Sequence, residues 1–232
     1  MKKIDFHSHI LPGADHGSDS VQTSMAQLQI ISEAGVNIVV ATPHYYPHVH
    51  IVSSYILDRD YCFNKLKDAI GENSFGVSLI IGAEVLVCEG LEQMRDLDKL
   101  CIKGTNTILL EMPFKPYCDA TIQTVKNIAD LGLNVVLAHI DRYDYDDVMR
   151  LLDMGGLHAQ LNTESLKSSA NRKRYMSLIK DGTVVALGSD LHGAKKSSYK
   201  HFDKVCELLG DNCNVIMKRT ESYIENAEKF EM

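Results

Sequence analysis

Short apolar runs alternate with amphipathic stretches along the whole chain. The apolar runs predict buried strands, whereas apolar residues spaced three or four positions apart indicate helices. The expected strands cover residues 3–7, 37–42, 77–87, 107–112, 134–139, 157–162 and 184–189. The expected helices cover residues 20–34, 53–70, 91–100, 119–131, 145–154, 171–181 and 199–209, and a last one lies near 215–229.

This alternation of strands and helices predicts an α/β fold, with a parallel sheet covered by helices. The sheet is either open and doubly wound or closed into a barrel. Polar side chains suited to metal binding follow six of the expected strands. A barrel gathers such groups from many strand ends around one rim, whereas an open sheet collects them at a single crevice. We therefore expect a distorted (β/α)7 barrel, a single domain of residues 1–232, and keep the open sheet as the alternative.

Composition narrows the class of protein and of partner. The chain has 232 residues, 45% hydrophobic and 24% charged, which is typical of a globular domain. Its net charge is -7 and no run of Lys and Arg dominates any element, so nucleic acid and anionic membrane are poor candidates for the main partner. The six cysteines include no C-x-x-C pair, and no apolar stretch could span a bilayer. We expect a cytoplasmic protein with free thiols and no membrane insertion.

Histidines and carboxylates cluster where the expected strands end. His7 and His9 project from the same face of a strand, because alternate side chains do, and Asp190 and His192 repeat this spacing. Four or five donors satisfy one ion, so nine predict two or three divalent ions with positions left open for water and substrate. Open positions indicate catalysis. The nine candidate ligands are His7, His9, His16, His44, Glu84, Glu111, His139, Asp190 and His192.

Taken one at a time, these residues have ordinary explanations. Glu84 and Glu111 could be surface carboxylates at strand exits, and His139 could be a hydrogen-bonded core histidine. Their coincidence on so many strand ends favours metal binding. Because a carboxylate can bridge two cations, Glu84 is the candidate bridge. His158 and His201 are expected to be structural.

Basic residues near the expected rim could bind an anion. Arg142 follows His139 by three positions, and a guanidinium matches the charge of a phosphoryl group, although a surface salt bridge is the competing explanation. Lys195 and Lys196 could assist, although a solvated basic loop is the commoner explanation for such a pair.

Two further features have weaker implications. The loop with Tyr45, Tyr46, His48 and His50 is either solvated or forms an aromatic wall near His44. Residues 213–219 (CNVIMKR) have the cysteine-to-arginine spacing of thiol-dependent phosphatases, but they lack the glycine-rich phosphate cradle and follow a helical pattern. We interpret that spacing as coincidence.

Several motifs in one order resemble a known family from Ile4 to about Ala227. They resemble the PHP (polymerase and histidinol phosphatase) superfamily, and within it the bacterial manganese-dependent protein-tyrosine phosphatases encoded with capsule and exopolysaccharide genes. Two positions depart from those phosphatases: residues 15–17 read DHG instead of DDG, and the loop at 193–197 lacks an Arg-Pro pair. The motifs are residues 5–13 (DFHSHILPG), 41–44 (ATPH), 82–84 (GAE), 110–111 (LE), 138–143 (AHIDRY) and 188–192 (GSDLH).

The resemblance implies a distorted (β/α)7 barrel with three metal ions, manganese first and iron or zinc as alternatives. It also implies that Arg142 and Asp190 take part in catalysis, and that the partner is an autophosphorylating bacterial tyrosine kinase that controls polysaccharide export. The implied ligand sets are His7, His9, Glu84 and Asp190 for the first ion, Glu84, Glu111 and His139 for the second, and His16, His44 and His192 for the third.

The expected activity is therefore metal-dependent hydrolysis of a phosphomonoester, with water activated by the ions and Arg142 stabilising charge on the phosphoryl group. Protein phosphotyrosine is the first candidate substrate. Another PHP phosphoesterase activity, on histidinol phosphate or a nucleotide, is the alternative within the same class. A non-catalytic, metal-loaded module that binds the kinase is the alternative from a different class.

Overall fold

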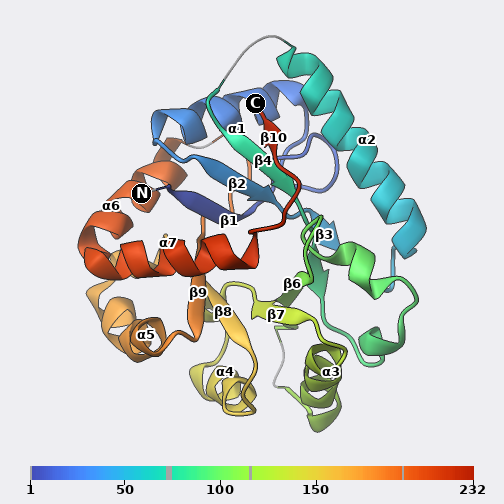
Figure 1. The fold of residues 1–232 in the computed structure, drawn as a ribbon, viewed down its shortest axis with the longest axis vertical. Coiled ribbons are helices and arrows are strands. Elements are labelled where there is room, and N and C mark those ends of the chain that lie inside the picture. The colour runs from blue at the N-terminus through green and yellow to red at the C-terminus, as the bar shows by residue number, and fades with distance from the viewer. Residues whose placement is uncertain (1, 72–74, 115–116, 195) are drawn as a thin grey trace.

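Parallel strands occupy the middle of the molecule and helices surround them (Figure 1). The structure, a computed structural model, describes residues 2–71, 75–114, 117–194 and 196–232. The strands are β1 (Ile4–Ser8), β2 (Ile38–Ala41), β3 (His44–Tyr45), β4 (Ser78–Ile81), β5 (Glu84–Leu86), β6 (Thr107–Glu111), β7 (Asn134–Leu137), β8 (His158–Asn162), β9 (Val184–Gly188) and β10 (Phe230–Glu231). The α-helices are α1 (Val21–Glu33), α2 (Val52–Ile70), α3 (Asp119–Asp130), α4 (Tyr145–Leu152), α5 (Ser169–Asp181), α6 (Lys196–Leu209) and α7 (Asp211–Tyr223).

The strands pair in two sheets that meet around a ring. One sheet has the order β1-β2-β4-β10 and the other β3-β5-β6-β7-β8-β9, and all pairs are parallel except β10 with β4. The last strand of the second sheet returns to the first strand of the chain. Asp190 N donates to His7 O at 2.8 Å, and Ser8 pairs with Leu191 in an isolated bridge. The expected parallel α/β architecture is confirmed.

The ring is distorted where the two sheets separate. The expected strand 77–87 is divided into β4 and β5, and the stretch from β2 to β3 is divided at Thr42 and Pro43. Because proline has no backbone N–H, it cannot continue the ladder. β2 pairs with β4 on one side of this break, and β3 pairs with β5 on the other.

Most expected elements are present, and one helix prediction is wrong. Residues 91–100 form two short 3-10 segments, η1 (Leu91–Gln93) and η2 (Leu97–Leu100), instead of one helix. Asp96 between them has φ 64°, a left-handed conformation that no helix interior permits. The last helix lies earlier than expected, at Asp211–Tyr223, and the two-residue strands β3 and β10 had no clear sequence pattern.

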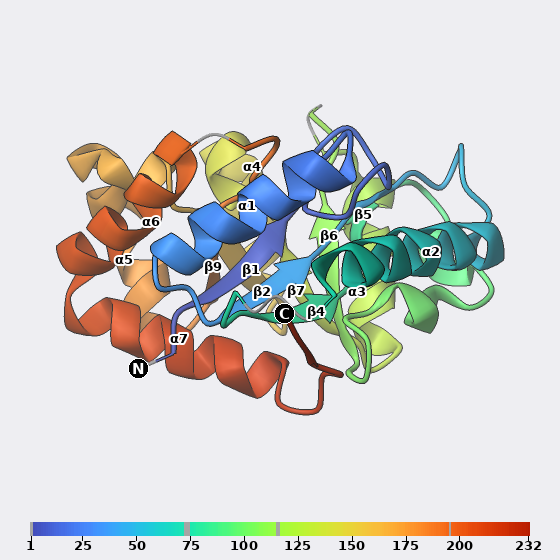
Figure 2. The ribbon, with the colours of Figure 1, turned by 90° about the horizontal axis from the view of Figure 1, so that it is seen from above.

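Helix α7 packs against the beginnings of the strands and leaves the opposite ends for the polar residues (Figure 2). Thr220 Oγ1 donates to Val185 O at 2.7 Å, and Ile4 N lies 3.3 Å from Met217 Sδ. The carboxyl ends of the strands therefore lie away from α7. No helix in the described ranges is both long and apolar enough to cross a bilayer.

Candidate metal centre

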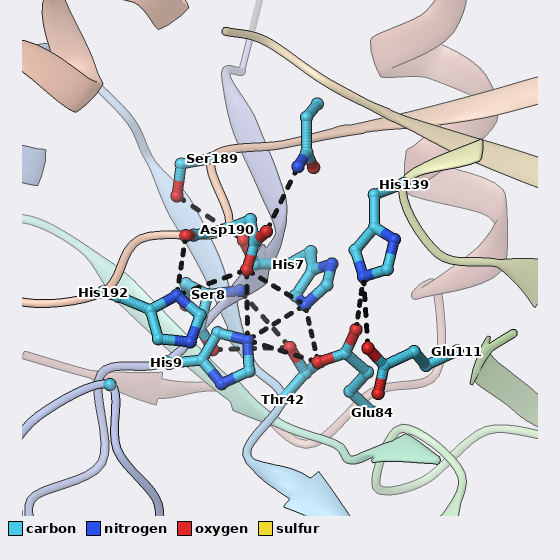
Figure 3. Close-up of polar contacts among 12 residues, drawn as sticks. His7, Ser8, His9, Thr42, Glu84, Glu111, His139, Ser189, Asp190 and His192 are labelled. Carbon is cyan, nitrogen blue, oxygen red and sulfur yellow. Dashed lines mark hydrogen bonds and ion pairs between the residues drawn. The ribbon is translucent and has the colours of Figure 1, made fainter. Parts of the chain in front are cut away.

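The carboxyl end of β1 brings two histidines against two carboxylates. His7 Nε2 and His9 Nε2 lie 3.1 Å apart, and both face Glu84 Oε2, at 3.2 and 3.3 Å (Figure 3). Asp190 Oδ1 lies 3.3 Å from His9 Nε2. Two imidazole nitrogens and two carboxylate oxygens thus converge on one point, as the ligands of a single cation do.

Glu84 lies at the middle of the cluster, and its two oxygens face different histidines. Glu84 Oε1 is 2.7 Å from His139 Nε2, and Glu84 Oε2 is 2.9 Å from His44 Nδ1. Glu111 lies beyond them, with its oxygens 4.0 Å from His139 Nε2 and 3.7 Å from His44 Nδ1. This central place agrees with the role of bridge expected for Glu84.

A third group of cluster residues consists of histidines. The ring centroids of His9 and His192 lie 4.1 Å apart. The ring of His16 stacks on His44, with centroids 4.9 Å apart, and lies 4.6 Å from His192, but His16 is exposed. All nine residues selected from the sequence therefore meet in one place. Within the described ranges, four sets of three have ligand atoms within 4.8 Å of one another: His9, His44 and His192; His7, His9 and Asp190; His7, Glu84 and His139; and His44, Glu84 and Glu111.

Strained backbone turns two of these side chains into the cluster. His139 has φ 30° and Asp190 has φ 51°, and each follows shortly after a strand ends. A left-handed conformation at a residue other than glycine costs about 1–3 kcal/mol and persists only where the surroundings enforce it. The hydrogen bond from Asp190 N to His7 O is one such constraint.

Two glycines allow the close packing around His7 and His9. A Cβ at Gly188 would lie 2.7 Å from the Cβ of His7 and 2.6 Å from Gln160 Nε2, and one at Gly17 would lie 2.0 Å from the Cβ of His9. Any larger residue at either position would displace a histidine of the cluster.

Side chains that the sequence analysis missed hold these histidines in place. Asp15 Oδ2 accepts from His9 Nδ1 at 2.6 Å, and Gln160 Oε1 accepts from His7 Nδ1 at 3.2 Å. Each bond places the proton on Nδ1 and leaves Nε2 free to bind a cation. Asn162 Nδ2 donates to Asp190 Oδ2 at 3.2 Å. Gln160 and Asn162 alternate on the buried β8, and this polar pair in an expected strand was the available signal.

The buried charges indicate that the cluster fits divalent cations. Burial lowers the pKa of His9, but Asp15, Asp190 and Glu84 outweigh this effect and hold it well above its usual value. Burial also acts on Glu84, yet His7 and its other histidine neighbours hold the Glu84 pKa well below its usual value. Burial, followed by the charge of Glu84, raises the pKa of Glu111 to about 7. Packed carboxylates thus demand nearby positive charge, which cations supply.

Unpaired atoms support the same conclusion. Among the described residues, four buried atoms of the cluster have no hydrogen-bond partner of acceptable geometry, although some lie close to other cluster atoms. Nitrogens and oxygens of this kind are donors that manganese, iron and zinc accept. The atoms are His44 Nδ1, Glu84 Oε2 and His192 Nε2, together with His139 Nδ1, which lies across its ring from the Nε2 that faces Glu84.

Arg142 lies at the edge of the cluster. Its Nη2 forms an ion pair with Asp190 Oδ2, and its side chain is 42% exposed, so its guanidinium reaches both the buried carboxylate and solvent. Lys195, the other expected anion-binding residue, lies outside the described residues, and Lys196 begins α6. Whether these lysines bind an anion stays a prediction.

The segment that runs from β3 to His50 is divided between the core and the cluster. Tyr46 stacks on His44, with ring centroids 5.2 Å apart and an interplanar angle of 17°, whereas Tyr45 is fully buried. His48 is exposed and His50 Nδ1 accepts from Tyr46 N at 3.0 Å. Of the four residues expected as an aromatic wall, Tyr46 is the one with a ring against a cluster histidine.

The remaining histidines lie away from the cluster, as expected. The ring of His158 contacts Tyr223, with centroids 5.2 Å apart, and His201 Nε2 lies 3.0 Å from Lys167 Nζ. Cys213 is buried in α7, at the other end of the strands.

Comparison with known proteins gives one family and several full-length relatives. Residues 3–228 match the model of a capsular polysaccharide synthesis family, CpsB/CapC. The tyrosine-protein phosphatase CpsB of Streptococcus agalactiae is 22% identical over 247 residues, covering 98% of this chain and 97% of its own. The protein of the same name from Streptococcus pneumoniae is 24% identical over 251 residues, covering 99% of this chain and 98% of its own.

Solved structures agree on the fold. A chain from the crystal structures of YwqE from Bacillus subtilis and CpsB from Streptococcus pneumoniae, described as metal-dependent tyrosine phosphatases, superposes with a TM-score of 0.76 at 21% identity, covering 99% of this chain and 97% of that one. A TatD-like protein from Archaeoglobus fulgidus superposes with a TM-score of 0.55 at 14% identity, covering 96% of this chain and 99% of that one.

Proposed function

Because the chain belongs to the CpsB/CapC capsular polysaccharide synthesis family, we propose that it is a metal-dependent protein-tyrosine phosphatase. The observation that carries the proposal is the convergence of histidines and carboxylates around Glu84, with the guanidinium of Arg142 at its edge. Relatives that match it over nearly their whole length have the same name, tyrosine-protein phosphatase CpsB.

The cluster residues would hold two or three divalent ions, with manganese the first candidate and iron or zinc the alternatives. When bound, the ions supply Lewis-acid stabilisation of the phosphoryl oxygens and an activated water. Glu84 would contribute a ligand to two ions, because its two oxygens face different histidines. The proposed ligands are His7, His9, His16, His44, Glu84, Glu111, His139, Asp190 and His192.

The residues of the chain contribute binding and orientation. Arg142 donates to the phosphoryl oxygens and stabilises the charge that develops on them. Asp190 orients that guanidinium through their ion pair, and it also faces His9. The cysteine-to-arginine motif of residues 213–219 takes no part, since Cys213 is buried in α7 at the opposite end of the strands.

The proposal also includes a substrate protein and a cellular compartment. A phosphotyrosyl protein is the substrate, and an autophosphorylating tyrosine kinase of polysaccharide export is the partner. Six free cysteines suit the reducing cytoplasm, where such a kinase tail would be dephosphorylated. The chain acts as one domain of residues 1–232, because its strands share one buried core.

Hydrolysis of a phosphotyrosyl peptide tests the proposal. Activity should disappear with a chelator, return with Mn²⁺, and remain in the Cys213→Ser variant. Histidinol phosphate and a nucleotide, assayed in parallel, should be hydrolysed more slowly. Metal-independent hydrolysis, or loss of activity in Cys213→Ser with its fold intact, would contradict the mechanism. Binding of the phosphorylated kinase without turnover under any divalent metal would instead indicate a non-catalytic module.

A further inference from the structure

A depression of about 300 Å³ opens beside the metal centre. Ligand pockets measure about 300–1,000 Å³, so its size suits one side chain of a larger substrate. Its walls combine three aromatic rings, one guanidinium and two carboxylates, and we name it the aryl slot. Those residues are Phe114, Tyr117, Arg142, Tyr143, Asp144 and Asp147.

The inner wall of the aryl slot is shared with the metal centre. The ring of Tyr143 lies 5.4 Å from that of His139, and Tyr143 Oη accepts from Met112 N at 3.0 Å. Arg142 lines the slot and pairs with Asp190. A group lying in the slot therefore has one end next to the candidate metal ligands.

The other walls of the aryl slot are aromatic, and their side chains leave ring surface and a hydroxyl available to a ligand. Phe114 and Tyr143 have ring centroids 5.5 Å apart at 50°, and Tyr117 meets Tyr143 at 6.2 Å and 70°. Phe114 is 68% exposed, so a large part of its ring meets solvent. The hydroxyl of Tyr117 is buried and has no hydrogen-bond partner among the described residues. Such tilted rings favour edge-to-face contact with another ring.

The charges around the aryl slot favour one orientation of a bound phosphoester. Asp144 and Asp147 repel an anion, whereas Arg142 attracts it. Asp144 is fixed in place, because its carboxylate accepts from the backbone N–H groups of Asp146 and Asp147 at 3.0 and 3.3 Å. A phosphate should therefore lie at the Arg142 end, with an apolar body along the aromatic walls.

We propose that the aryl slot binds the phenyl ring of a phosphotyrosyl side chain and that Phe114 is a specificity-determining residue for aryl over alkyl phosphoesters. This inference rests on the proposed phosphatase function and adds a substrate-selecting site to it. An alkyl ester such as phosphoserine reaches the same centre, but its side chain is too short to contact the ring of Phe114. The slot thus discriminates by contacts that only the aryl substrate makes.

Kinetics of Phe114→Ala on two matched peptides test the inference. The peptides differ only in phosphotyrosine or phosphoserine at one position. We expect kcat/KM for the phosphotyrosyl peptide to fall about tenfold, mainly through KM, since ring contacts are equal in the ground and transition states. The phosphoseryl peptide should change by less than about twofold. Phe114→Tyr should keep the wild-type preference, and Leu131→Ala, at another exposed apolar residue, should change neither rate.

The outcomes separate this inference from the proposed function. Normal phosphotyrosine hydrolysis with an unchanged ratio of the two peptides in Phe114→Ala would overturn the aryl slot and leave the phosphatase proposal intact. An equal fall on both peptides would also overturn it, because it would indicate a general effect on the centre. Failure of the wild-type protein to hydrolyse either peptide with Mn²⁺ present would overturn the phosphatase proposal, and the inference with it.

Discussion

Asp15 and His9 form the shortest histidine–carboxylate contact of the cluster region, with 2.6 Å between Asp15 Oδ2 and His9 Nδ1. Asp15 is itself fixed, because it accepts from Gly17 N at 2.8 Å and from His44 N at 3.0 Å. A carboxylate in this position orients the imidazole and raises its basicity as a ligand. Asp15 thus sets the geometry of His9 and of the backbone at His44 together.

Replacement of Asp15 by Asn should weaken metal binding without removing a ligand. Loss of such an outer contact typically costs about 10–100-fold in metal affinity or activity. Titration of the chelated protein with Mn²⁺ measures the change, and excess Mn²⁺ should restore most of the phosphatase activity. Asp19→Asn, at an exposed carboxylate nearby, is the matched control. An unchanged Mn²⁺ affinity in Asp15→Asn would show that His9 needs no such partner.

Gln160 should matter for both stability and metal binding. Its Oε1 accepts from His7 Nδ1 and from His139 N, the latter at 2.7 Å. Gln160→Leu leaves these buried donors unpaired, which costs about 1–3 kcal/mol of unfolding free energy, and it frees the ring of His7 to rotate. Thermal unfolding and Mn²⁺ titration should therefore both report a loss. Gln123→Leu, on the exposed face of α3, should change neither.

Arg142→Lys should separate phosphoryl binding from metal binding. The lysine keeps the charge but loses the planar, two-pronged donor, so kcat/KM on phosphotyrosyl peptide should fall about 10–100-fold. Metal content should stay at the wild-type value, because Arg142 is not a ligand. Arg95→Lys, whose side chain is 95% exposed, is the control. Equal activity in Arg142→Lys and Arg95→Lys would assign Arg142 to a surface ion pair.

His16 should hold the ion that is lost most easily. It is exposed, and its ring stacks on His44 and lies tilted against His192, whereas the other proposed ligands are buried or half-buried. His16→Ala should therefore lower the bound metal by about one ion per chain and retain the remainder. Elemental analysis measures this, with His48→Ala as the exposed-histidine control. Complete metal loss in His16→Ala would contradict a centre whose ion sites lose metal independently.

The sequence predicted residues that meet in the candidate metal centre, because these residues lie next to features that are local in the chain. Each candidate ligand follows within a few residues of an apolar run, and parallel strands bring their carboxyl ends to one rim. Local patterns could not predict the partners of those ligands. Gln160 contacts His7 and His139 from another strand, and Asp15 contacts His9 through the fold of the loop after β1, so neither contact follows from local spacing.

For the fold too, local patterns did not predict features that depend on long-range contacts. Alternation predicted the parallel strands, but it could not predict that Pro43 would separate β2 from β3, so that the ring forms two sheets. The 3-10 segments at Leu91–Gln93 and Leu97–Leu100 have an apolar spacing that resembles a helix, and the left-handed Asp96 between them breaks it. The aryl slot was also missed, since Phe114 and Tyr143 meet only in three dimensions.

The metal content of the purified protein, measured together with its phosphotyrosine hydrolysis, tests the central claim most directly. Protein chelated and then loaded with Mn²⁺ should hold two or three ions per chain, and activity should rise with occupancy. Glu84→Gln should lose both metal and activity, the latter by about a thousandfold, because several kcal/mol of stabilisation disappear with the bridging carboxylate. Exposed Glu89→Gln should lose neither. Full phosphotyrosine hydrolysis by protein that contains no divalent ion would contradict the account.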